Sequence, residues 1–252
     1  MRRVARASTC AVVLALALAA GARAGGFPQF GRGCARDDFR SVGTTIRAEL
    51  CRTSAAGGRA VVVLHGCGGF STFDHRLATE LPGEGISTLD VDYFGPTPPP
   101  GRKGFCGGPR VGNPFPVWVQ VVRDAARALR ATSGVDPRGV GVVGWSLGGG
   151  VALAAAAGPP ATRPFSALAG FSTGAFGPTL AEASGLPPTI LLSAGSTDAI
   201  PLADTLPLYR ALTAAHVPSA LYVYPRGSHD WPGRQGTLGI RHAAAFLRKH
   251  LR

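Results

Sequence analysis

Short hydrophobic runs rich in valine, leucine and isoleucine recur along the chain from residue 60 onward, and polar or glycine-rich segments separate them. Apolar runs of this length without polar alternation are typical of strands that are buried on both faces of a sheet. The pattern predicts strands at 61–65, 86–91, 140–144, 167–171, 189–194 and 220–225.

Between these runs, apolar residues recur at helical spacing, which predicts helices at 73–81, 116–131, 146–157, 202–215 and 237–251. Because strands alternate with helices, the expected fold class is α/β, with a mostly parallel central sheet and helices on both of its faces. The segment 37–50 is expected to add one or two antiparallel strands at an edge of this sheet.

The segment 94–116 interrupts the alternation. Six prolines and six glycines lie between Phe94 and Pro116, and no helical or strand period is present. The segment follows the carboxyl end of a predicted strand, which is where open α/β sheets bind ligands. It is therefore either one wall of a binding site or a surface excursion.

The first 24 residues have the pattern of a secretory signal peptide. Three arginines occur among the first six residues, a run of ten apolar residues follows, and the segment ends in Ala-Arg-Ala. Residues 25–252 are then expected to form a single α/β domain that is secreted or periplasmic. No later run approaches the about 20 apolar residues of a membrane-spanning helix, so stable membrane insertion is not expected; an uncleaved anchor is the alternative.

Composition excludes several classes of protein. Hydrophobic residues make up 45% of the 252 residues, and the glycines and prolines follow no collagen period, so a globular core is expected. The formal charge of +12 could suggest nucleic-acid binding, but no basic run exceeds two residues. A basic stripe that follows a phosphate backbone is therefore absent from the sequence, and no nucleic-acid partner is expected.

A nucleophile motif is present in Gly144-Trp145-Ser146-Leu147-Gly148, which matches G-x-S-x-G. The pentapeptide alone has little specificity in a glycine-rich chain, but here it follows an apolar strand and opens an alanine-rich helix, as a nucleophile elbow requires. Ser146 is the candidate nucleophile, and the N–H of Leu147 is a candidate oxyanion donor. The alternative is that Ser146 serves only as a helix N-cap.

A serine nucleophile needs a base and an acid that orients the base. His229 lies in the loop after the last predicted strand, whereas the other histidines lie in helical patterns, at a helix end or before the elbow. Asp198 follows the penultimate strand and is the candidate acid, with Asp204 and Asp230 as weaker alternatives. The chain order of Ser146, Asp198 and His229 is that of α/β-hydrolases.

The glycine-rich turn His65-Gly66-Cys67-Gly68-Gly69 follows an earlier strand. Such a turn lets a substrate carbonyl approach backbone N–H groups, so the amide of Cys67 is the second candidate oxyanion donor; a purely connecting turn is the alternative. A zinc site at His65 and Cys67 is not expected, because no third and fourth ligands cluster at suitable spacing. No metal is therefore expected.

Removal of the signal peptide takes away Cys10 and leaves four cysteines in an oxidising compartment. Cys34 and Cys51 bracket the possible edge hairpin, and Cys67 and Cys106 lie in two loops at the same end of the sheet. These positions favour the pairs Cys34–Cys51 and Cys67–Cys106. The alternative is four buried free thiols.

These motifs, together with the segment 89–96, Gly195-x-x-Asp198 and Gly227-x-His229, resemble the dienelactone hydrolase family of α/β-hydrolases over residues 55–251. The resemblance implies a Ser or Cys nucleophile with His and Asp, no cofactor, and hydrolysis of small-molecule esters or lactones. Dienelactone hydrolases proper use cysteine where this chain has Ser146, which favours a generic exported carboxylic-ester hydrolase. A peptidase or an acyltransferase would share the triad, whereas a noncatalytic binding protein would be expected to lack one of its members.

Overall fold

The computed structural model describes residues 33–97, 104–106, 113–174, 182–195, 198–200 and 202–251. The predicted signal peptide, Cys10 and most of the predicted loop at 94–116 lie outside these residues. No helix in the described part of the chain combines the length and the apolar composition that a bilayer crossing requires.

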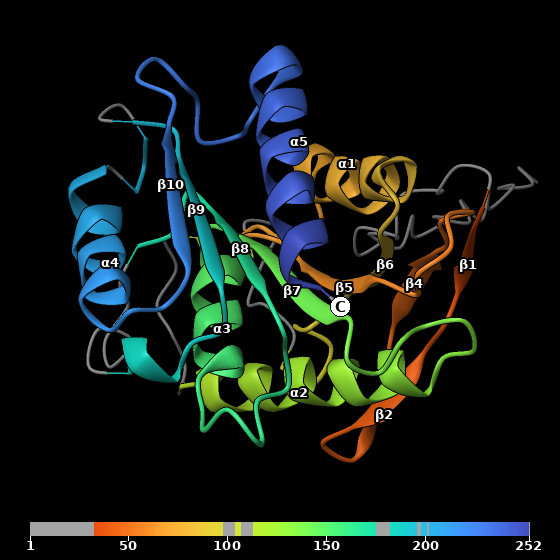
Figure 1. Ribbon diagram of the computed structural model, residues 1–252. Coiled ribbons are helices and arrows are strands. Elements are labelled where there is room, and N and C mark those ends of the chain that lie inside the picture. The colour runs from red at the N-terminus through yellow and green to blue at the C-terminus, as the bar shows by residue number, and fades with distance from the viewer. Residues whose placement is uncertain are drawn as a thin grey trace, which may run out of the picture.

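An eight-stranded sheet forms the centre of the molecule, in the order β1-β4-β6-β5-β7-β8-β9-β10 (Figure 1). From β6 to β10 neighbouring strands are parallel, whereas β4 pairs antiparallel with both β6 and β1. The strands are β1 Cys34–Arg36, β4 Ala48–Cys51, β5 Ala60–Leu64, β6 Ser87–Val91, β7 Val140–Trp145, β8 Leu168–Phe171, β9 Thr189–Ser193 and β10 Ser219–Val223.

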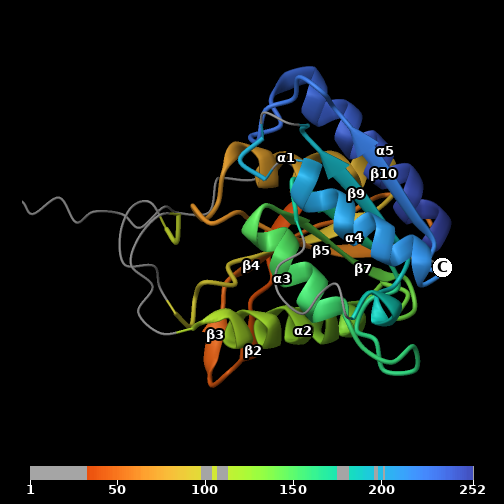
Figure 2. The same cartoon turned by 90° about the vertical axis from the view of Figure 1, so that its left-hand side faces the viewer.

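Helices cover both faces of this sheet, as the sequence predicts (Figure 2). Side chains of α1 and α5 pack into the core on one face, and side chains of α2, α3 and α4 pack into the core on the other. The helices are α1 Thr72–Glu80, α2 Phe115–Ala131, α3 Leu147–Ala156, α4 Leu202–Ala214 and α5 Gly233–His250, with short 3-10 helices at Leu81–Glu84 and Ala183–Gly185.

The structure corrects three expectations. The segment 37–50 holds three short strands instead of one or two, because β2 (Phe39–Ser41) and β3 (Thr44–Ile46) form a separate hairpin before β4, and β1 precedes the segment. β10 is partly exposed, because it is the edge strand of the sheet and has a neighbour on one side only. α5 begins about one turn earlier than predicted, directly after Pro232, since proline is tolerated at the start of a helix.

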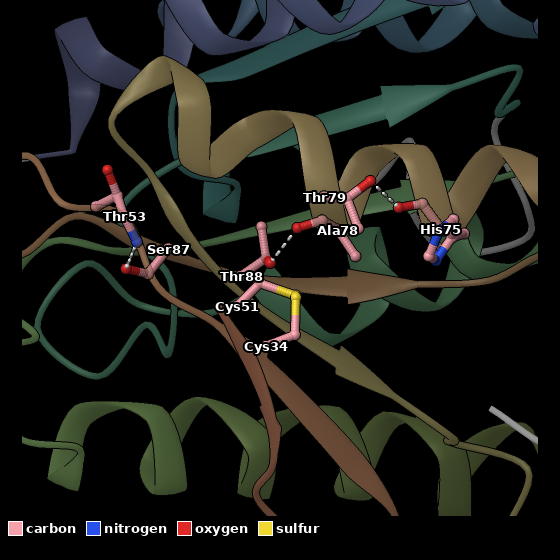
Figure 3. Close-up of a disulfide and its surroundings, with 8 residues drawn as sticks. All are labelled: Cys34, Cys51, Thr53, His75, Ala78, Thr79, Ser87 and Thr88. Atoms are coloured by element: carbon pink, nitrogen blue, oxygen red, sulfur yellow. Dashed lines mark hydrogen bonds between the residues drawn. A yellow bond between two sulfur atoms is a disulfide. The ribbon is translucent and has the colours of Figure 1, made fainter. Parts of the chain in front are cut away.

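A disulfide closes the N-terminal edge of the sheet (Figure 3). Cys34 and Cys51 lie opposite each other in the β1–β4 pair, and their Cα atoms are 4.0 Å apart. Cys51 in turn pairs with Thr88 of β6, whose hydroxyl donates a hydrogen bond to the carbonyl of Ala78 in α1 at 2.7 Å. The Cys34–Cys51 disulfide therefore fastens β1 to the part of the sheet that α1 covers.

Two carboxyl groups are buried between β6 and α1, where an apolar core would be expected. Asp74 and Asp90 are both fully buried, and neither carboxylate oxygen of Asp90 has a hydrogen-bond partner among the described residues. Burial raises the pKa of Asp90 well above its ordinary value, and the carboxylates of Asp74 and Glu49 raise it further. Burial also raises the pKa of Asp74 to about 6, although Ser71 donates hydrogen bonds to it.

Both groups bind protons more tightly in the folded chain than in the unfolded chain, so folding stability should fall as pH rises from about 4 through these raised pKa values. Asp90→Asn removes the charge and nearly preserves the shape. We expect the melting temperature of this variant to exceed that of the wild type at pH 8 and to match it near pH 4. In a chain of this size each 1 kcal/mol recovered adds about 2–4 °C.

Calorimetry over this pH range measures the effect. Asp204→Asn is the matched control, because Asp204 is an exposed aspartate on α4, and its melting curve should follow the wild type. An Asp90→Asn protein that is no more stable than the wild type at pH 8 would contradict the interpretation.

Candidate active site

The sequence-predicted site residues gather at the carboxyl ends of the parallel strands. Ser146 follows β7, Asp198 follows β9, and His229 follows β10. The turn that contains Cys67 follows β5, whose immediate neighbour in the sheet is β7. Because these strands are parallel, their ends meet at one edge, and the structure brings all of the candidates to it.

Ser146 occupies a sharp turn between β7 and α3. Its backbone has φ 54° and ψ −120°, a combination that non-glycine residues rarely adopt and that costs on the order of 1–3 kcal/mol. The turn is possible because glycines stand two residues before and two residues after Ser146. A Cβ on Gly144 would lie 2.3 Å from the carbonyl oxygen of Gly148. The Ser146 side chain makes no capping hydrogen bond to α3, so its hydroxyl is directed elsewhere.

That hydroxyl lies 3.1 Å from Nε2 of His229. On the other side of the ring, Nδ1 of His229 is hydrogen-bonded to a carboxylate oxygen of Asp198. An ionised aspartate only accepts hydrogen bonds, so Nδ1 carries the proton and Nε2 is free to accept one from Ser146. The three residues thus form one hydrogen-bonded chain from acid to base to hydroxyl.

Asp198 is held as an anion by three donors. Burial of the carboxyl group raises its pKa, but hydrogen bonds from His229, from the hydroxyl of Ser172 and from the backbone N–H of Ile200 at 3.0 Å outweigh burial and leave the pKa below its ordinary value. The side chain of Asp198 is fully buried, whereas that of His229 is 23% exposed. The candidate acid is therefore shielded from water, whereas the candidate base is partly exposed.

Ser172 and two tryptophans support this chain, and the sequence analysis missed their roles. The indole N–H of the buried Trp231 donates to the hydroxyl of Ser172 at 2.9 Å, and Ser172 donates in turn to Asp198. The indole N–H of Trp145 donates to the carbonyl of His229 at 2.8 Å, which fixes the base loop. One signal was present for Ser172: it directly follows the carboxyl end of a predicted strand beside the nucleophile strand.

The weaker candidates lie elsewhere. Asp204 is exposed in the first turn of α4, and Asp230 is exposed beside the base; in the structure His229 bonds to Asp198 instead. Among the competing histidines, His242 is hydrogen-bonded to the hydroxyl of Tyr224 at 2.8 Å. His65 is fully buried at the start of the turn His65–Gly69, which is called the oxyanion turn because it contains a candidate oxyanion donor.

The turn after β5 fixes the direction of the Cys67 amide. Nδ1–H of His65 donates to the carbonyl of Gly66 at 2.9 Å, and the N–H of Gly69 donates to the same carbonyl at 3.2 Å. In a planar trans peptide the N–H points away from the carbonyl, so anchoring the Gly66 oxygen sets where the N–H of Cys67 points. Burial lowers the pKa of His65 to about 4, which leaves the ring neutral near pH 7.

The second disulfide, Cys67–Cys106, joins this turn to the long loop after β6. The backbone N–H of Phe105 also donates to the carbonyl of Cys67 at 2.7 Å. Gly104 allows the two backbones to approach, since its φ is +60° and a Cβ would lie 2.2 Å from the Cys67 oxygen. Both disulfides follow the pairing that the sequence favours, and this one fixes the peptide that carries a candidate oxyanion donor.

The Leu147 amide is the other candidate donor. Leu147 is the first residue of α3, and the first N–H groups of a helix have no partner within it and favour negative charge.

Among the described residues, no group of three or more His, Cys, Asp or Glu side chains is placed to hold a metal ion.

Much of the chain matches a known protein family. Residues 110–248, more than half of the chain, match the dienelactone hydrolase family, and they include the elbow, the acid and the base. The chain belongs to the dienelactone hydrolase family. The candidate nucleophile of this family member is Ser146, whereas the resemblance described above implies cysteine in dienelactone hydrolases proper.

Curated relatives and solved structures also resemble this chain. Two uncharacterised proteins of Mycobacterium tuberculosis, from strains CDC 1551 and H37Rv, are each 31% identical over 198 residues, which is 71% of this chain and 66% of their own length. The chain thus spans just under two thirds of these curated relatives. The crystal structure of a dienelactone hydrolase from Anabaena variabilis superposes with a TM-score of 0.66 at 22% identity, over 87% of this chain and 98% of that one.

Within the candidate active site, a first prediction for this dienelactone hydrolase family member concerns His65 as a positioning residue. His65→Leu keeps most of the side-chain volume but removes the hydrogen bond to Gly66. For an ester substrate, kcat should therefore fall on the order of 10- to 100-fold with little change in KM. This loss is somewhat smaller than the loss in kcat that follows complete removal of an oxyanion donor. His65→Asn retains an N–H donor near the position of Nδ1 and should recover most of kcat. Equal kcat for the leucine variant and the wild type, at equal folded fraction, would refute this role.

A second prediction separates the two disulfides. They close segments of 17 and 39 residues, and loss of either should destabilise the fold by about 3–4 kcal/mol in the chain-entropy picture. Cys106→Ser should also lower kcat, because the Cys67 turn loses its covalent anchor, whereas Cys34→Ser should lower stability alone. Thermal unfolding and ester kinetics at a temperature where both variants are folded measure the difference. A kcat that is unchanged in Cys106→Ser would contradict the prediction.

Proposed function

We propose that this protein is an exported serine hydrolase that cleaves carboxylic esters or lactones through a covalent acyl-enzyme. Membership of the dienelactone hydrolase family supports the reaction class. The observation that carries the proposal is the hydrogen-bonded chain from Asp198 through His229 to Ser146. Ser146 lies directly before Leu147, at the end of β7, and the neighbouring strand β5 leads into the turn that contains Cys67.

Acylation begins at the Ser146 hydroxyl. Nε2 of His229 takes the hydroxyl proton while Oγ forms a bond to the carbonyl carbon of the ester. The ring becomes an imidazolium, and the ionised Asp198 stabilises this charge through Nδ1–H. The low pKa of Asp198 suits it to this task, because a protonated acid would offer no countercharge.

The carbonyl oxygen takes up negative charge as the tetrahedral intermediate forms. The N–H groups of Cys67 and Leu147 donate hydrogen bonds to this oxygen, and the N-terminus of α3 adds a favourable field. Each such donor is worth on the order of 10²–10³ in kcat in serine hydrolases. Because both amides are fixed before substrate binds, little reorganisation is needed during the reaction.

The intermediate collapses when the C–O bond to the leaving alcohol breaks and the imidazolium of His229 gives that alcohol its proton. Water then attacks the acyl group on Ser146, with His229 again accepting a proton, and the acid product leaves. Oγ regains its proton at the end of the cycle. In a lactone the same carbon–oxygen bond opens, and acid and alcohol remain in one product.

Export is supported by two independent features. The first 24 residues have the charge, apolar run and small residues of a signal peptide. The chain forms two disulfides, and such bonds persist in oxidising compartments. Expression of the full chain in a bacterium, followed by fractionation and N-terminal sequencing, tests this part of the proposal; a mature protein that retains residue 1 in the cytosol would reject it.

Ser146→Ala tests the nucleophile. The variant should fold with an unchanged melting temperature or a slightly higher one, and kcat for p-nitrophenyl esters should fall by a factor on the order of 10⁴ or more. Mass spectrometry of the wild type after treatment with an organophosphonate should place the adduct on Ser146. An adduct on another serine would exclude this mechanism.

The same assay tests the base and the acid. His229→Ala should cost about as much as Ser146→Ala, and the double variant little more, since members of one catalytic unit act non-additively. Asp198→Asn should cost less than either. If Asp230→Asn abolished activity while Asp198→Asn stayed active, the assignment of the acid would be wrong.

A further inference from the structure

A small apolar cavity lies beside the proposed oxyanion donors. Its volume is about 30 Å³, and its lining residues are Phe105, Asn113, Pro114, Phe115, Trp118 and Leu147. The aromatic rings pack edge to face: the ring centroids of Phe105 and Trp118 are 4.8 Å apart, and those of Phe115 and Trp118 are 6.4 Å apart. A larger hollow of about 190 Å³ is lined by charged residues of β1 and β4, three or more strands from β7.

The lining residues connect this cavity directly to the reacting atoms. Leu147 lines the cavity, and its N–H is one of the proposed oxyanion donors. Phe105 donates a backbone hydrogen bond to Cys67 and precedes Cys106, whose disulfide partner is Cys67. Each proposed oxyanion donor is therefore attached to one wall of the cavity.

The strand order decides which half of an ester faces this cavity. The leaving alcohol must take its proton from His229, which enters the site from the β8–β10 side of β7. Phe105 enters from the opposite side, in the loop that follows β6. With the alcohol near His229 and the carbonyl oxygen at the two amides, the remaining substituent of the carbonyl carbon, the acyl group, is directed toward the cavity.

We propose that this cavity is the acyl-binding pocket and that it limits good substrates to uncharged acyl groups of two or three carbons. Apolar and aromatic side chains make up most of its wall, so it favours an apolar group over a charged one. A cavity needs about 10–15 Å³ to hold one water molecule, and a cavity that binds benzene measures about 150 Å³. The pocket thus has room for a methyl or ethyl group but not for a ring or a long chain. This inference rests on the proposed hydrolysis at Ser146.

A series of p-nitrophenyl esters from acetate to octanoate tests the proposal on the wild-type protein, because the alcohol is constant and only the acyl group changes. The expected result is a maximum of kcat/KM at acetate or propionate and a decline of at least tenfold by octanoate. An optimum at hexanoate or beyond would overturn the proposal.

Phe115→Ala should enlarge the pocket and raise the octanoate-to-acetate ratio of kcat/KM at least tenfold. Phe105→Ala should change the ratio in the same direction, which keeps the test valid if one variant folds poorly. Phe39→Ala is the matched control: Phe39 is also a partly buried phenylalanine packed on the same core cluster, but it does not line the cavity. The proposal fails if the control changes the ratio as much as Phe115→Ala does, or if neither pocket variant changes it.

The outcomes separate this inference from the proposed function. If none of the esters is hydrolysed and an organophosphonate leaves Ser146 unmodified, the proposed function itself is wrong. If esters are hydrolysed at Ser146 but Phe115→Ala leaves the chain-length profile unchanged, ester hydrolysis stands and the pocket assignment falls. A set of acetate esters with different alcohols completes the test: a Phe115→Ala effect on alcohol preference alone would assign the cavity to the leaving group.

Discussion

The close approach of the α3 backbone to β5 and β7 is the contact on which the rest of the site depends. A Cβ at Gly148 would lie 2.4 Å from the carbonyl oxygen of His65 and 2.6 Å from that of Leu64. Only glycine permits this distance, and it places the start of α3 against the strand that leads into the oxyanion turn. Ser146, the Leu147 amide and the Cys67 amide are thereby held by one rigid junction, which is strong enough to keep Ser146 in a strained backbone conformation.

The loops on the two sides of this junction are held in place by different kinds of bonds. The β5–β6 side, which carries the Cys67 amide, is fastened by a disulfide and by a backbone hydrogen bond from Phe105. The β8–β10 side, which carries the base, is held by side-chain hydrogen bonds from Trp145 and Ser172. This division fits the chemistry, because an oxyanion donor must stay fixed whereas a base must bond alternately to the nucleophile and to the leaving group.

Sequence reasoning recovers what is encoded locally. Short apolar runs identify the central strands. The G-x-S-x-G motif selects Ser146, and loop position together with chain order selects Asp198 and His229, which the structure joins in one hydrogen-bonded chain. The number and bounds of the N-terminal strands escape it, since three-residue strands are too short to show a period. The link from Trp231 through Ser172 to Asp198 also escapes it, because it depends on how side chains from three separate loops point toward one another, which no single segment encodes.

Asp198 and Asp90 are both buried, but of the two only Asp198 receives hydrogen bonds from described residues that stabilise its ionised form. Asp198 is ionised because His229, Ser172 and a backbone amide all donate to it. Asp90 is equally buried but has no such donors among the described residues, and Asp74 lies near enough to raise its pKa. Asp74 also caps α1, the helix that begins just after the oxyanion turn. The charge state of Asp74 and Asp90 is therefore coupled to α1, although neither carboxyl group takes part in the proposed reaction.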